Sequence, residues 1–211
     1  AAWLAQRLHL RKRRAAALPL LVLSGVGYQV SFALLSPQGL DSLSAPYANS
    51  WHAVYARQAA LERPVSEIIR SYESDYAEEY YFAMTKPPGV ILFYAWMERL
   101  AGWIDPAEGE AARLENLLGF ITFVYPLLAM LPVLLLYRLG RMLSLKEEHA
   151  LLPSIFWLCI PGVILMQLFL DQALYPFLFL AGALLAVQLC RRPSGWLALG
   201  LGVYLFSALF F

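Results

Sequence analysis

Charged residues and cysteines are both scarce in this 211-residue chain, and the two shortages narrow its class. Asp, Glu, Lys and Arg supply 15% of the residues, whereas apolar residues supply 60%. A soluble domain carries roughly 25% charged residues, so this composition predicts an integral membrane protein. The two cysteines, Cys159 and Cys190, lie in apolar runs and form no CxxC pair, which argues against a disulfide framework.

Motifs that define common enzyme classes are also missing. The three histidines share no metal-ligand spacing, and the chain has no HExxH, no GxSxG and no P-loop sequence. No metal site is therefore predicted from a motif, although a divalent metal held by loop carboxylates stays open as a cofactor. A net charge of +1 gives no basis for binding nucleic acid.

Long uncharged runs fill much of the chain instead. Residues 15–35 contain no charge, and about 20 apolar residues match a hydrocarbon core of roughly 30 Å. Further runs cover residues 117–137, 150–170 and 172–190, and residues 196–211 begin a fifth run that stops with the chain. We therefore predict an all-α integral membrane protein, a multi-span helical bundle, and expect the sequence to be a piece of a longer one.

Residues 36–116 differ from the rest because they hold 12 of the 15 acids but only 6 of the 16 cations. This composition predicts a long loop outside the cytoplasm. Residues 49–61 and 64–76 are expected to form short helices that lie on the membrane surface with the apolar side down. In the second helix the apolar residues follow helical spacing: Val65, Ile68, Ile69 and Tyr72.

The segment 89–103 is apolar but contains Glu98 and Arg99. Its 15 residues would rise about 22 Å, which is short for a span, so we expect a surface or re-entrant helix. If it does not cross, all ten cations outside the long loop fall on one side, including those of the basic segment 1–14. The positive-inside bias then makes that side cytoplasmic and the long loop periplasmic or extracellular.

Two charged residues stand next to apolar runs on the outer side. Lys86 precedes two prolines that fix φ, and a lysine so held can bind a phosphate. The alternative is an interfacial lysine whose ammonium group extends to water. Asp171 lies between two apolar runs, where an ionisable residue indicates a functional site. It can equally cap the next helix, because Asp is a favoured N-cap residue.

Carboxylates alternate with tyrosines in the middle of the long loop, a pattern that suits a sugar-binding site. Carboxylates serve as general bases or metal ligands. The alternative is a solvated acidic loop with tyrosines at the membrane interface. The loop carboxylates that could serve in either way are Asp41, Glu73, Asp75, Glu78 and Glu79. Among them we select Asp41 and Asp75 as candidate bases, and we select Glu73, Glu78 and Tyr81 as candidate substrate contacts.

The order of these features resembles the N-terminal module of GT-C fold glycosyltransferases. Four short sequences carry the resemblance. In chain order they are KPPGVILFY, which begins at Lys86; the Arg-Leu pair at Arg113, which opens the next span; LYRLGR, which ends at Arg141; and the Leu-Asp pair, which ends at Asp171. The chain is most similar to the protein O-mannosyltransferase and aminoarabinose-transferase branch, whose members carry a Lys/His-Pro-Pro motif. The resemblance covers nearly the whole chain.

This resemblance implies a transferase that uses a polyprenyl-phosphate-linked sugar, with membrane lipid around it and an active site facing the periplasm or exterior. Lys86 would contact the donor phosphate, and Asp171 matches an aspartate near the active site. These enzymes normally use an acidic residue early in the first outer loop, often in an Asp-Glu pair. This chain has no such pair, and Asp41 is the only acid near that place.

Two other functions remain open. The missing Asp-Glu pair favours a non-catalytic accessory subunit of GT-C type, which would assemble with partner membrane subunits. A transporter of lipid-linked intermediates is the third candidate. Transporters often contain repeated halves, and this sequence shows no internal repeat.

Overall fold

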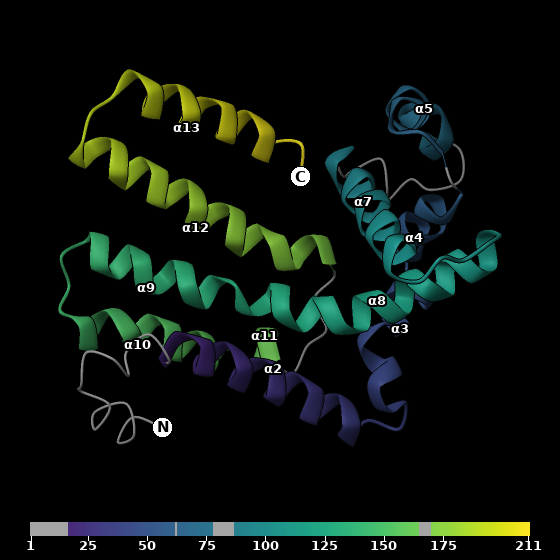
Figure 1. The fold of residues 1–211 in the computed structure, drawn as a ribbon, viewed down its shortest axis with the longest axis horizontal. Helices are drawn as coiled ribbons and strands as arrows, with labels where there is room; N and C mark the ends of the chain where they lie inside the picture. Colours follow the sequence, from purple (N-terminus) through teal and green to yellow (C-terminus); the bar gives the residue numbers. More distant parts are fainter. Residues whose placement is uncertain (1–16, 62, 78–86, 165–169) are drawn as a thin grey trace.

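A computed structural model describes residues 17–61, 63–77, 87–164 and 170–211. Every regular element in these ranges is a helix (Figure 1). Three helical segments among them are long and apolar enough to cross a membrane: Ala17–Leu35, Glu110–Met142 and Ala173–Arg191.

Several helices lie side by side as a layer (Figure 1). Helices α8 (Glu110–Met130), α9 (Pro132–Met142) and α12 (Leu170–Arg191) run in one direction. Helices α2 (Ala17–Leu35) and α13 (Gly195–Ala208) run the opposite way, and α13 packs against α12. At 14 residues α13 rises about 21 Å, less than the core of a bilayer.

A turn at Leu131 divides the expected span 117–137 into two helices. Pro132 has no N–H for the carbonyl of Leu128, which accepts a bond from the Leu131 N–H instead (3.2 Å). Neighbouring side chains reach carbonyls next to this break. The Ser154 hydroxyl donates to the Val133 carbonyl at 2.7 Å, and the Trp157 indole donates to the Ala129 carbonyl at 2.9 Å.

The single helix expected over 150–170 is instead two helices as far as the chain is described. Helix α10 covers Glu147–Trp157, and α11 covers Pro161–Ile164. The cause is Pro161, which cannot donate to the Trp157 carbonyl, so the Ile160 N–H does so at 3.3 Å. The Gln29 amide then binds α11 to α2 by donating to the Val163 carbonyl at 2.6 Å.

One end of the layer carries a cluster of further helices (Figure 1). It contains η2 (Gly39–Leu43), α3 (Ala45–Asn49), α4 (Ala53–Ala60), α5 (Val65–Ala77) and α7 (Gly89–Ile104). The clustered helices pack on one another and on α8, and they enclose the larger group of buried apolar residues.

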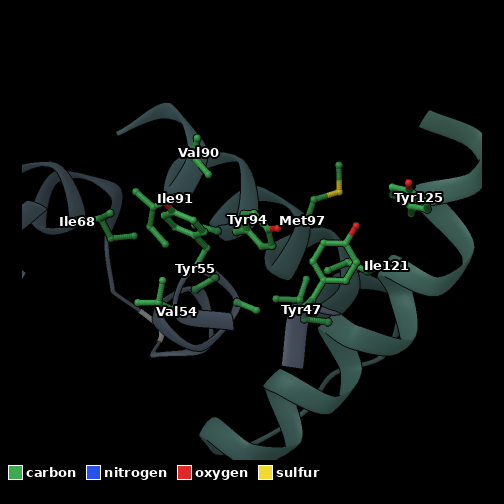
Figure 2. Packing of buried hydrophobic residues seen from close by; sticks show 14 of the residues in the cluster. Tyr47, Val54, Tyr55, Ile68, Val90, Ile91, Tyr94, Met97, Ile121 and Tyr125 are labelled. Carbon is green, nitrogen blue, oxygen red and sulfur yellow. The ribbon is translucent and has the colours of Figure 1, made fainter. Parts of the chain in front are cut away.

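Four buried tyrosines fill much of this cluster: Tyr47, Tyr55, Tyr94 and Tyr125 (Figure 2). The Tyr55 and Tyr94 rings stack at 5.7 Å between centroids. Tyr47 lies 6.2 Å from Tyr94 and 6.3 Å from Tyr125. These rings join α3, α4, α7 and α8, so they fix the positions of the helices around them.

Helix α4 differs from the expectation of a helix with its apolar side on a membrane. Most of its side chains are buried against α7 and α8, because five of its eight residues are Ala or Val and allow close approach. Trp51 lies in the turn before α4 and is 80% exposed, so it does not share the buried face of Tyr55. In α5, Ile68 is buried while Val65 and Ile69 are exposed.

The opposite end of the layer holds the connections at residues 143–146 and 192–194 (Figure 1). A hydrogen bond links the end of α12 to the first of these connections: the Arg191 guanidinium donates to the Ser144 hydroxyl at 2.6 Å. Five cations therefore lie at or near this end: Arg138, Arg141, Lys146, Arg191 and Arg192.

Candidate functional site

The Pro-Pro-Gly sequence after Lys86 forms the start of α7. Proline suits the first turn of a helix, where its missing N–H has no partner to lose. The Pro88 carbonyl already accepts a bond from the Leu92 N–H at 3.2 Å. The Gly89 N–H donates to the Phe210 carbonyl at 2.7 Å, and a methyl group on Gly89 would overlap that carbonyl. Glycine is therefore required here by the close approach of the end of α13.

A tyrosine side chain of α12 reaches the same place. The Tyr175 hydroxyl donates to the Phe211 carbonyl at 2.9 Å, and the Phe93 ring of α7 packs on the Phe211 ring at 6.4 Å. Gly89 and Phe93 of α7 and Tyr175 of α12 therefore all contact residues 210–211. Asp171 is the second residue of α12 and precedes Tyr175 by about one helical turn.

The other predicted site residues are placed less closely together. Asp41 is exposed on η2, which packs against α2 and α8. Glu73 is exposed on α5, and Asp75 lies further along that helix, which packs against α7. The two candidate bases thus lie on different helices with different neighbours. Three candidates fall outside the described residues: Glu78, Tyr81 and Lys86.

Tyr72 of α5, which precedes Glu73 in sequence, is partly enclosed. Tyr72 packs against the buried apolar cluster, and burial raises the pKa of its phenol above the ordinary value. Of the predicted aromatic and acidic stretch, Tyr72 and Glu73 are the members whose side chains the structure describes.

Metal ligands do not gather in the part of the chain that is described. There, no three His, Cys, Asp or Glu side chains come together in a way that could hold an ion. His52 is buried and packs edge-on against Tyr55 at 5.9 Å.

Sequence reasoning missed a buried ion pair that joins α7 to α8. Arg113 directs Nε and Nη2 at Glu98 Oε1, each at 2.7 Å, and the two side chains are 13% and 6% exposed. A carboxylate within an apolar run requires a cationic partner, and that signal was present in the sequence. The pair borders a cavity of about 360 Å³, which is lined by Ala59, Arg63, Pro64, Ala95, Glu98, Arg99 and Arg113.

No family model, curated protein or solved structure matches this chain.

Proposed function

We propose that this chain is a membrane-embedded module of a glycosyltransferase that takes sugar from a polyprenyl-phosphate-linked donor. The observation that carries the proposal is the junction at residues 210–211. Gly89, three residues after Lys86, and Tyr175, four residues after Asp171, both bond to that short segment. Lys86 precedes the start of α7 in sequence, and a lysine at such a place can bind a phosphate as a compact positive charge.

We further propose that the layer of helices spans the membrane, with the helical cluster outside. Three segments have the length and composition for this role. The five cations near residues 143–146 and 192–194 lie at the opposite end from the cluster, and the positive-inside bias makes that end cytoplasmic. The junction of α7 with α12 would then face the periplasm or exterior, where a lipid-linked donor presents its sugar.

In the proposed reaction, Lys86 pairs with the phosphate of the donor. An acceptor hydroxyl or amine gives its proton to a carboxylate, Asp41 or Asp75, and attacks the anomeric carbon. The bond between that carbon and the phosphate oxygen breaks, and the lipid phosphate leaves with the electron pair. Lys86 stabilises the negative charge on the departing phosphate. Asp171 and the acids and tyrosines near Glu73 would orient the sugar.

The proposal is tested by the binding of undecaprenyl phosphate to the purified protein, measured by native mass spectrometry. Lys86→Ala is expected to weaken binding by about tenfold or more, the size of a lost charge-assisted hydrogen bond. Lys146→Ala is the matched control, because Lys146 is an exposed lysine at the other end of the layer. Equal binding by both variants and the unaltered protein would remove the phosphate role from Lys86.

A non-catalytic accessory subunit is the second candidate. It is favoured by the exposed position of Asp41 on η2, whose packing partners differ from those of α5. Such a subunit would bind the lipid phosphate through Lys86 and transfer no sugar. Transfer assays with Asp41→Asn and Asp75→Asn separate the two functions, because a transferase would lose turnover in one of these variants while retaining the lipid.

A further inference from the structure

We infer that one side of α7 lies in the outer leaflet of the membrane, with phospholipid packed against it. This side, called the aromatic face below, consists of Phe93, Trp96, Leu100, Trp103 and Ile104. At about 3.6 residues per turn, the five residues fall within one sector of the helix. The inference rests on the proposal that the layer spans the membrane, and it makes no use of the transferase activity.

Helix α7 has a covered side and an open side along its length. The covered side packs against α4 and α8 and carries the buried residues Val90, Ile91, Tyr94, Ala95, Met97, Glu98 and Ala101. On the aromatic face, Trp96, Trp103 and Ile104 are 54%, 83% and 66% exposed in the described part of the chain. A helix on the surface of a soluble protein turns polar residues outward, so this helix is reversed for an aqueous setting.

The aromatic face is continuous with the surface of α13. The Phe93 ring packs on the Phe211 ring at 6.4 Å between centroids, just after α13 ends. Ring contacts continue along α7 from Phe93 to Trp96 at 6.1 Å. On the other side of this junction, Phe210 packs against Phe206 of α13 at 5.8 Å, and both rings are exposed. One apolar surface therefore extends from α13 onto α7.

This continuity identifies lipid as the material that covers the aromatic face. Helix α13 has no charged residue and no buried residue, and it packs against α12 within the layer. In the proposed orientation, lipid covers the outer side of α13. Figure 1 draws α7 next to the end of α13 and inclined to the helices of the layer. Lipid around the end of α13 therefore also meets α7, at the boundary between the membrane and water.

The residue types of α7 suit this boundary better than the centre of a bilayer. Tryptophan is enriched where the hydrocarbon core meets the headgroups, and the aromatic face carries Trp96 and Trp103. Arg99 is exposed beside this face, and its long side chain can lie along apolar surface while the guanidinium stays among headgroups. Helices of this kind bury their apolar side about 5–10 Å into the boundary region.

Spin labels on the full chain in phosphatidylcholine nanodiscs test the inference. In a variant without the native cysteines, a nitroxide is attached at Trp96→Cys or at Trp103→Cys, and power saturation measures its collisions with oxygen and with a water-soluble nickel chelate. Leu199→Cys, on the exposed surface of α13, is the lipid reference, and Arg70→Cys, on the exposed surface of α5, is the water reference. Both α7 labels should meet oxygen severalfold more often, relative to nickel, than the Arg70→Cys label does.

Three other outcomes would overturn the inference, and the references separate them. If the α7 labels match Arg70→Cys while Leu199→Cys stays in lipid, the aromatic face lies in water and the proposed layer stands. If Leu199→Cys also matches Arg70→Cys, the layer does not span the membrane and the inference fails with it. If neither reagent reaches the α7 labels, protein covers the face, and spectral broadening that unlabelled protein dilutes away would identify it as a second copy. None of these readings depends on sugar transfer.

Discussion

Removal of Arg113 alone should destabilise the protein far more than removal of the whole ion pair. At 2.7 Å and an effective dielectric constant of about 20, the attraction is worth roughly 6 kcal/mol before desolvation. Desolvation costs several kcal/mol for each ion, so the net value of the intact pair is small. Arg113→Met leaves Glu98, a residue 5% exposed, as a buried charge without its partner. We expect a loss of about 3–5 kcal/mol.

The double variant Glu98→Leu with Arg113→Met should recover most of that loss, because apolar side chains of similar volume often replace a buried pair at little cost. The free energy of unfolding is measured by titration with denaturing detergent in mixed micelles, followed by circular dichroism. The double variant is expected within about 1–2 kcal/mol of the unaltered protein. Equal stability of the single and double variants would refute the view that Glu98 depends on Arg113.

Three further predictions concern the junction, the broken helix and the orientation in the membrane. Gly89→Ala should lower the free energy of unfolding by about 1–3 kcal/mol, because the added methyl group overlaps the Phe210 carbonyl. Gly102→Ala in the same helix is the control: its methyl group meets nothing within 4 Å, so the change should be neutral or stabilising. Gln29→Leu should cost about 1–3 kcal/mol in the same unfolding assay, because a buried carbonyl of α11 loses its donor; no loss would show that α11 does not need this contact. In a variant without the native cysteines, a thiol at Asp41→Cys should react with a membrane-impermeant reagent on intact cells and one at Lys146→Cys should not, and the reverse result would invert the proposed topology.

The helices of the layer could be predicted from sequence more readily than their breaks. The uncharged runs 15–35 and 172–190 coincide with α2 and most of α12. Proline alone does not decide where a helix breaks. Pro126, Pro153 and Pro176 lie within helices, whereas new helices begin at other prolines.

The breaks depend on partners that are distant in sequence. Pro132 begins α9, where the Val133 carbonyl accepts a hydrogen bond from Ser154, 21 residues away in sequence. Pro161 begins α11, where the Val163 carbonyl accepts one from Gln29, 134 residues away in sequence. Local sequence does not reveal which carbonyls such side chains will reach. The breaks follow from tertiary packing, which a single-sequence pattern does not contain.

The candidate site was predictable only in part for the same reason. The Lys-Pro-Pro-Gly sequence marks the start of a helix, but nothing local indicates that Gly89 meets the end of α13 more than 100 residues later. Glu98 and Arg113 each stood out as charges beside apolar runs. Their pairing depends on how α7 packs against α8, and so does the cavity that they border.

Photo-crosslinking with a polyprenyl-phosphate analogue that carries its reactive group beside the phosphate tests the central claim most directly. The adducts, mapped by mass spectrometry, should fall at the starts of α7 and α12, and Lys86→Ala should reduce them by about tenfold while Lys146→Ala leaves them unchanged. Adducts at residues 143–146 and 192–194 instead, or adducts that Lys86→Ala does not alter, would contradict a lipid-phosphate site at the junction of α7 with α12.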